Sequence, residues 1–113
     1  MKKLLILILL VVFSVGGYAS SQKAFEIKRG INLSHWLSQR IPNGPSIQEG
    51  MNETDFNRIA RAGFDHVRLP IDEEVLWYEN GEKNKEAFSY LHKGIQWALQ
   101  NDLKVIVDLH IVR

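Results

Sequence analysis

The sequence predicts an α/β fold made of the first three strand-helix units of a (β/α)8 barrel (a TIM barrel), in truncated form. Strand-like apolar runs alternate with helical patterns, as parallel strands joined by crossover helices do. The second and third runs carry aliphatic side chains at one parity and mainly ionisable ones at the other. A barrel can place such polar residues on its inner face, whereas a sheet with helices on both faces is apolar throughout. A complete barrel needs about 250 residues, and this chain has 113.

The first unit begins with a strand predicted from Phe25 to Leu33. A loop is expected from Ser38 to Gly50, because the Pro-Asn-Gly-Pro sequence at 42–45 is typical of irregular surface segments. No regular element is predicted inside that loop.

The helix of the first unit has apolar residues at i, i+3 and i+4. These residues are Phe56, Ile59 and Ala60. Asn52 or Thr54 can cap the amino end of the helix, and Gly63 can end it.

The second unit starts with a strand predicted from Asp65 to Leu69, which should end at Pro70. A helix is expected from Glu86 to Gln100. Its apolar face would consist of Phe88, Leu91, Ile95, Ala98 and Leu99. The third strand is predicted from Lys104 to Leu109, without a helix after it.

Side chains along a strand alternate between two faces, so the two later strands can be divided by parity. One face would be aliphatic and lie under helices: Val67, Leu69, Val105, Val107 and Leu109. The other face would carry most of the ionisable groups: His66, Arg68, Ile106, Asp108 and His110. The sequence therefore predicts that Arg68 and His110 point toward one cavity at the carboxyl ends of the strands.

The amino-terminal residues 1–19 are predicted to be a secretory signal peptide. Lys2 and Lys3 precede an uncharged apolar run from Leu4 to Val15, and cleavage after Ala19 suits the small residues there. An uncleaved signal anchor is the alternative, although the run is shorter than the roughly 20 residues of a membrane span. The product is expected to be exported and periplasmic, cell-surface or extracellular.

Charge and composition exclude several classes of function. Without residues 1–19 the chain has twelve basic and thirteen acidic residues, a formal charge of −1, which does not suit a nucleic-acid-binding protein. Cysteine is absent, so disulfides and cysteine-linked lipid attachment are excluded. His66, Asp108 and His110 share a face but lack the spacing of a known metal site, and no cofactor is predicted.

Three motifs occur in a characteristic order. They are RGINLSHWL at Arg29–Leu37, GFDHVRLPI at Gly63–Ile71 and LKVIVDLH at Leu103–His110. Together they resemble the opening third of the cellulase-like enzymes of glycoside hydrolase family 5. Two departures concern the subfamily: Ser34-His35 stands where many relatives have Gly-Gly, and Ile111-Val112-Arg113 replaces a frequent Pro-Gly.

The resemblance implies a retaining glycosidase that acts on β-glucan or a related polysaccharide. Arg68 would support the nucleophile carboxylate and His110 would contact a sugar hydroxyl, while Asn32 and Trp36 are further substrate-binding or site-supporting residues. The catalytic acid/base and nucleophile would be glutamates beyond Arg113. The 113-residue chain alone would therefore be inactive.

Plainer interpretations remain for the same residues. Arg68 could form a structural ion pair with Asp108, Trp36 could be a packing residue, and the acidic run at 72–74 could be solvated or form a first helical turn. The alternative function is a non-catalytic secreted carbohydrate-binding module. Its stacking platforms would be Trp36, Trp77 and Tyr78.

Overall fold

The computed structural model describes residues 24–111, so the predicted signal peptide lies outside the described residues. Three parallel strands form one sheet in the spatial order β1-β2-β3. Their bounds are Gly30–Asn32 for β1, His66–Asp72 for β2 and Lys104–His110 for β3. The helices are α1 (Ile47–Gly50), α2 (Glu53–Arg61), α3 (Glu73–Leu76) and α4 (Lys85–Gln100).

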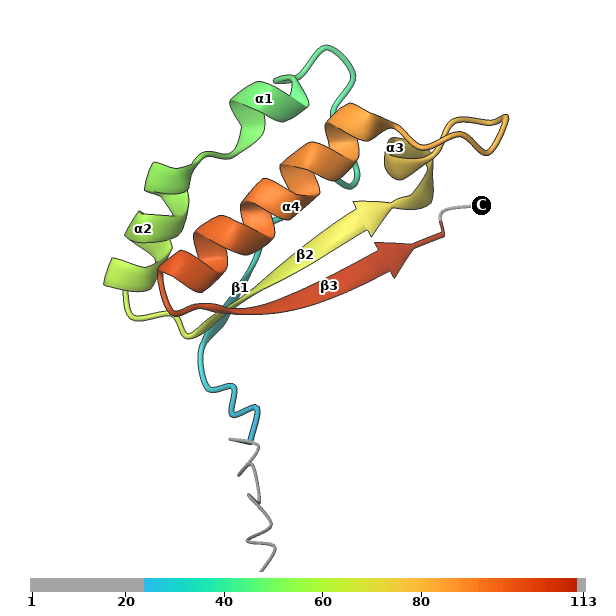
Figure 1. Ribbon diagram of the computed structural model, residues 1–113. Helices are drawn as coiled ribbons and strands as arrows, with labels where there is room; N and C mark the ends of the chain where they lie inside the picture. Colours follow the sequence, from blue (N-terminus) through green and yellow to red (C-terminus); the bar gives the residue numbers. More distant parts are fainter. Residues whose placement is uncertain (1–23, 112–113) are drawn as a thin grey trace, which may run out of the picture.

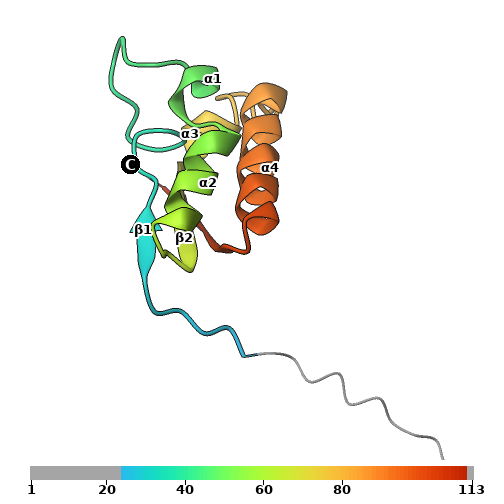
Figure 2. The same ribbon diagram turned by 90° about the vertical axis from the view of Figure 1, so that its left-hand side faces the viewer.

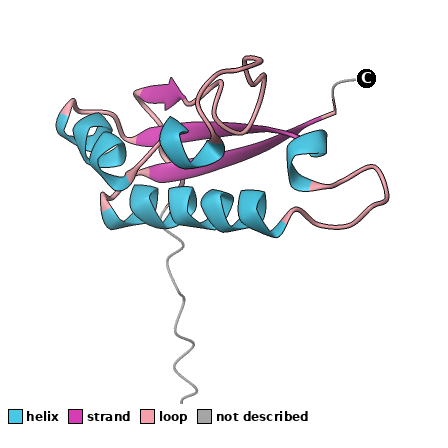
Figure 3. Cartoon of the chain, turned by 90° about the horizontal axis from the view of Figure 1, so that it is seen from above, coloured by secondary structure: helices cyan, strands magenta, loops and turns pink. Residues whose placement is uncertain are grey.

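The helices lie on one side of the sheet, as the two side views show (Figures 1 and 2). Seen from above, α4 runs alongside the strands (Figure 3). One face of the sheet is thus covered by helices and the other, over the described residues, is not. This is the division that the parity of the strands predicted. Within residues 24–111, none of the helices combines the length and apolar character that crossing a membrane requires.

The first strand is much shorter than predicted, since only Gly30–Asn32 pair with β2. The preceding N–H groups of Lys28 and Arg29 donate instead to the Asp65 side chain, at 2.8 and 3.1 Å. These bonds take the place of backbone bonds to a neighbouring strand, so β1 begins at Gly30 and its predicted start at Phe25 is wrong. The sequence carried a strand-like composition there, but no neighbouring strand reaches that far.

The second strand continues through Pro70 to Asp72, beyond its predicted end. In a parallel strand, alternate residues direct their N–H and C=O groups to opposite neighbours. The C=O of Arg68 accepts from Leu33 on the β1 side, so Pro70 also faces that side. Because β1 has already ended at Asn32, the missing N–H of Pro70 removes no ladder bond.

The predicted loop from Ser38 to Gly50 contains the single-turn helix α1. The Glu49 carboxylate accepts hydrogen bonds from the N–H and the hydroxyl of Ser46, at 2.9 and 2.8 Å. These bonds hold the pKa of Glu49 below its usual value, with the backbone bond as the larger cause. A Ser-x-x-Glu capping signature was therefore present in the sequence and was missed.

The helix α2 follows its predicted signals closely. The Asn52 side chain accepts from the N–H groups of Thr54 and Asp55, so Asn52 rather than Thr54 is the cap. Gly63 adopts φ +86°, which favours glycine. Phe56 on this helix has no solvent exposure.

The helix α4 buries a face that differs from the predicted one. The residues buried on it are Ala87, Leu91, Gly94 and Ala98. Phe88 and Ile95 lie at the margin of that face, and Leu99 is 60% exposed, so its assignment to the core was wrong. The buried stripe is narrow because Trp36 occupies the space above Gly94.

The aliphatic face predicted for both later strands is buried only on β2. Val67, Leu69 and Ile71 have at most 1% exposure, whereas Val107 and Leu109 on β3 are 51% and 48% exposed. The helix layer therefore covers the central strand fully and β3 only near its start.

We expect Gly94→Ala to destabilise the fold, although alanine favours a helix by about 1 kcal/mol over glycine. A Cβ at position 94 would lie 2.8 Å from Cη2 and 2.9 Å from Cζ3 of the buried Trp36 ring. Overpacking of this kind costs about 1–3 kcal/mol. Urea unfolding should show a lower midpoint for Gly94→Ala. As the control, alanine in place of the exposed Ser89 on the same helix should leave the midpoint unchanged or raise it slightly. A higher midpoint for Gly94→Ala would contradict the packing argument.

Candidate active site

Arg68 is brought to the uncovered face of the sheet by the register of three strands. It pairs with Asn32 at the end of β1 and with Ile106 on β3. Four residues of β2 follow it, so Arg68 lies within the strand rather than at its end. Its long side chain extends toward the carboxyl ends, where Asp108 and His110 follow at alternate positions of β3.

The guanidinium group of Arg68 connects side chains from all three strands. Nη1 donates to the Asn32 side-chain oxygen at 2.5 Å, and Nη2 donates to the Asp108 carboxylate. The Nε2 atom of His110 lies 2.8 Å from the same Nη2 and 2.9 Å from Oδ2 of Asp108. The structure thus brings together three of the four predicted site residues, Arg68, His110 and Asn32. We call Asn32, Arg68, Asp108 and His110 the arginine cluster.

The proton on His110 decides which neighbour its Nε2 atom binds. The guanidinium of Arg68 can only donate, and an ionised Asp108 can only accept. A protonated Nε2 therefore donates to Asp108, whereas an unprotonated Nε2 accepts from Arg68. The imidazole can change partner without a change in the backbone.

Asp108 is the residue of this cluster that was not among the site residues predicted from the sequence, where it was considered as an ion-pair partner of Arg68 and, with His66 and His110, as a metal ligand. The hydrogen bond from His110 is the largest cause that holds the pKa of Asp108 below its usual value, and the bond and charge of Arg68 act in the same direction against partial burial. Asp108 is therefore an ionised acceptor that orients both neighbours. Its alternation with His110 on β3 was a signal that could have placed it in the site.

His66 lies on the same face but has a structural environment. Its Nδ1 atom is 2.5 Å from Oδ1 of Asp65, and that bond is the main cause of the lowered pKa of Asp65. Its ring also lies across Gly30, where a Cβ would be only 2.0 Å from Nε2. His66 thus packs on β1 and fills the sheet near the amino ends of the strands.

Trp36, the fourth predicted site residue, is 3% exposed and lies among the helices. Its indole N–H donates to the Ile47 carbonyl at 2.8 Å, and its ring fits against Gly50 and Gly94. This is the packing role that the sequence left open. A sugar-contacting role or a stacking platform does not fit so buried a ring.

The acidic run 72–74 was expected to be solvated or to form a first helical turn, and it does open α3, with Asp72 as the N-cap and Glu73 and Glu74 in the first turn. Solvation is wrong for Asp72 itself. It is 5% exposed at the end of β2, and its Oδ2 accepts from the N–H of Gln39 at 2.6 Å. Its Oδ1 is buried without a hydrogen-bond partner. Arg68, Pro70 and Asp72 share one parity, so the signal was present but was hidden by the assumption that Pro70 ends the strand.

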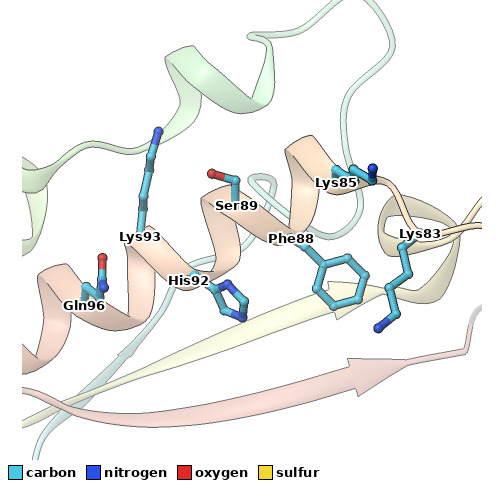
Figure 4. Close-up of a pocket in the computed structure, with 7 residues that line it drawn as sticks. All are labelled: Lys83, Lys85, Phe88, Ser89, His92, Lys93 and Gln96. Atoms are coloured by element: carbon cyan, nitrogen blue, oxygen red, sulfur yellow. The ribbon is translucent and has the colours of Figure 1, made fainter.

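One pocket lies near the carboxyl ends of the strands, and another lies along α4. One, of about 510 Å³, is lined by Asp72, the segment after it and the exposed residues Leu109 and Ile111. The other, of about 460 Å³, lies against α4 and is lined partly by Lys83, Lys85 and Lys93 (Figure 4). Its lining residues lie on α4 and just before it and include none of the arginine cluster, so it is not the candidate active site. Among residues 24–111, the acidic and histidine side chains form no group able to hold a metal ion.

Comparison with known proteins identifies the family. Residues 20–112 match the family model described as Cellulase (glycosyl hydrolase family 5). The chain belongs to glycosyl hydrolase family 5. The structures of this family imply a (β/α)8 barrel, so the parallel strands with helices on one face are a partial view of that fold.

Two curated relatives and one solved structure show how far the similarity extends. Endoglucanase C of Acetivibrio thermocellus is 35% identical over 86 residues, which cover 74% of this chain and 25% of that protein. Cellodextrinase A of Ruminococcus flavefaciens is 34% identical over 78% of this chain and 26% of its own. Thermotoga maritima Cel5A, solved with cellobiose, has a TM-score of 0.61 and 29% identity over 74% of this chain and 27% of its own. The chain thus spans about a quarter of each of these family members.

Proposed function

We propose that this chain forms the opening part of the catalytic barrel of a secreted endo-β-glucanase that hydrolyses β-linked polysaccharide with retention of configuration. The observation that carries the proposal is the arginine cluster, in which one guanidinium joins side chains from three parallel strands on the uncovered face. Active sites of (β/α)8 barrels lie at the carboxyl ends of their strands. The family membership supports the same position.

The chemistry assigned to Arg68 follows from its geometry and charge. A guanidinium presents several donors in a fixed plane and stays charged, so it can orient a carboxylate and keep it ionised. A retaining glycosidase needs a nucleophilic carboxylate and an acid/base carboxyl about 5 Å apart. Asp108 is the one carboxylate of the arginine cluster, and it is already engaged by Arg68 and His110. The catalytic glutamates would come from later strands of the whole barrel, so the 113-residue chain alone should be inactive.

The proposed substrate is a β-glucan or a related β-linked polysaccharide. The names of the relatives, an endoglucanase and a cellodextrinase, support this class. His110 would contact a sugar hydroxyl, because its imidazole can donate or accept a hydrogen bond at the edge of the arginine cluster. Neither a metal nor an organic cofactor is needed by this mechanism.

The proposed site of action is outside the cytoplasm. Support comes from the sequence alone: Lys2 and Lys3 precede the apolar run from Leu4 to Val15, and small residues that suit cleavage end at Ala19. The processed protein would be periplasmic, cell-surface or extracellular. Mass measurement of the mature amino terminus tests this part independently of activity.

Hydrolysis of soluble oligosaccharides by the whole protein tests the proposed activity. We expect cleavage of β-1,4-, β-1,3- or mixed-linkage gluco-oligosaccharides, and proton NMR should detect the β-anomer as the first product. Initial formation of the α-anomer would contradict the retaining mechanism. Absence of hydrolysis on all β-linked glucans, mannan and xyloglucan would contradict the proposed function.

A further inference from the structure

The outer side of α4 carries an open groove that the arginine cluster and the core leave unused. Its volume of about 460 Å³ lies in the range of roughly 300–1,000 Å³ seen for binding sites. Ser89 and Lys93 extend from one flank of the helix, and Phe88 and His92 extend from the other (Figure 4). At 3.6 residues per turn these positions lie opposite the buried stripe of α4. The groove therefore faces away from the sheet.

Positive charge is concentrated in this groove. Three of the five lysines in residues 24–111 line it, and no acidic residue does: Lys83, Lys85 and Lys93. The ion pairs found among residues 24–111 include none of these three lysines. Glu86, the acidic residue of α4, instead accepts a hydrogen bond from Gln48 of α1 at 2.6 Å. The described part of the protein thus supplies no carboxylate partner for the charge of the groove.

Aromatic rings hold two of the three ammonium groups in place. Nζ of Lys83 lies 5.4 Å from the centroid of the Phe88 ring, and Nζ of Lys93 lies 4.4 Å from that of Tyr90. The Phe88 ring is itself fixed, because its centroid lies 5.3 Å from that of Trp77 in an edge-to-face pair. A lysine that is already ordered loses less rotamer freedom when it binds an anion. The groove is therefore ordered before a negatively charged ligand arrives.

The spacing of the groove residues favours a polymer over a single anion. Lys85 and Lys93 are separated by eight positions of α4, which corresponds to about 12 Å along the helix axis. One small anion cannot contact both ammonium groups, whereas a chain with repeated carboxylates can. Ser89 and Gln96 lie on the same side of α4 and offer neutral donors and acceptors that suit hydroxyl groups. The combination matches a polymer that carries both carboxylates and hydroxyls.

We infer that this groove binds a linear polysaccharide of uronic acid units, whose carboxylates pair with the three lysines and whose hydroxyls contact Ser89 and Gln96. The helix layer and the arginine cluster lie on opposite sides of the sheet, so a bound chain leaves the cluster open (Figure 1). The acidic residues that begin α3 repel such a ligand from the carboxyl ends of the strands. This site goes beyond the proposed function, because it attaches the protein to an acidic polysaccharide and takes no part in hydrolysis.

Calorimetric titration of the whole protein with polygalacturonate at low ionic strength tests the inference. A triple variant with glutamine in place of the three lysines should bind about tenfold more weakly, since each exposed ion pair contributes modestly. The three side chains are exposed, so the variant should fold. The matched control removes the same charge outside the groove, through Lys28→Gln, Arg40→Gln and Arg61→Gln, and should bind like the unaltered protein. Added salt should weaken binding to the unaltered protein.

Other outcomes would overturn the inference. Equal weakening in the control variant would mean that net charge, and not the groove, sets the affinity. Tighter binding of inorganic polyphosphate or of phosphatidylglycerol vesicles than of polygalacturonate would assign the groove to another ligand class. Slow reductive methylation of the three lysines in the whole protein, relative to Lys28, would mean that another part of the protein covers the groove.

Hydrolysis separates this inference from the proposed function. The triple variant should keep the kcat/KM of the unaltered protein on a neutral gluco-oligosaccharide, because its lysines lie away from the arginine cluster. Binding of polygalacturonate without hydrolysis of any β-glucan would support the groove and contradict the function. Hydrolysis without any binding of polygalacturonate would support the function and overturn the groove.

Discussion

Replacing Arg68 by lysine should lower kcat/KM for β-glucan by about 100-fold, in the range measured for loss of one preorganised donor in an active site. Lysine keeps the positive charge but is a point donor on a flexible stem. It cannot serve Asn32, Asp108 and His110 in one plane, as the guanidinium does. The measurement is steady-state hydrolysis of a soluble gluco-oligosaccharide by the whole protein.

The same variant distinguishes a site role from a structural ion pair. Arg61→Lys at the end of α2 is the matched control and should leave hydrolysis unchanged. If Arg68 only paired with Asp108, Arg68→Lys would change the unfolding midpoint and leave kcat/KM within about threefold. In the proposed role it should also move the acidic limb of the pH–rate profile upward, because weaker contacts raise the pKa of the carboxyl groups that Arg68 holds.

Replacing Phe56 by alanine should cost about 3–5 kcal/mol of unfolding free energy, the range for buried aromatic residues. Its side chain has no exposure. It packs edge-on against Trp36 at 6.4 Å between ring centroids and tilted against Trp97 at 5.8 Å. Removal of the ring would leave a cavity between α2, α4 and the segment that carries Trp36.

Urea unfolding of the whole protein, followed by tryptophan fluorescence, measures this loss. Phe25→Ala provides the control, because that ring is 57% exposed and its removal should change stability by less than about 0.5 kcal/mol. A loss below 1 kcal/mol in Phe56→Ala would mean that the aromatic contacts do not hold the helix layer together.

Elements that depend on short-range signals were predicted well. The helix α2 follows from the Asn52 cap, the spacing of its apolar residues and the left-handed position of Gly63. The third strand was placed within one residue, since its predicted end at Leu109 compares with an observed end at His110. Caps and apolar spacing act through neighbouring residues, so one sequence is enough to identify them.

Elements that depend on distant neighbours were predicted less well. The length of β1 is limited by the carboxylate of Asp65, which takes the N–H groups before Gly30. Pro70 is tolerated inside β2 because β1 has ended beside it. Leu99 fits the helical period, yet it is exposed because the buried stripe of α4 centres on Gly94 beneath Trp36.

The sequence by itself determined which side chains share a face, because strand alternation is a property of the backbone and holds whatever packs nearby. That rule placed Arg68 and His110 on the face that the helices leave uncovered. Only the tertiary structure decided that Asn32 and Asp108 accept hydrogen bonds from Arg68. It also decided that Trp36 is buried among the helices and that one side-chain oxygen of Asp72 has no hydrogen-bond partner. Those outcomes depend on register and on packing between residues more than thirty positions apart, such as Asn32 and Arg68, which no local pattern records.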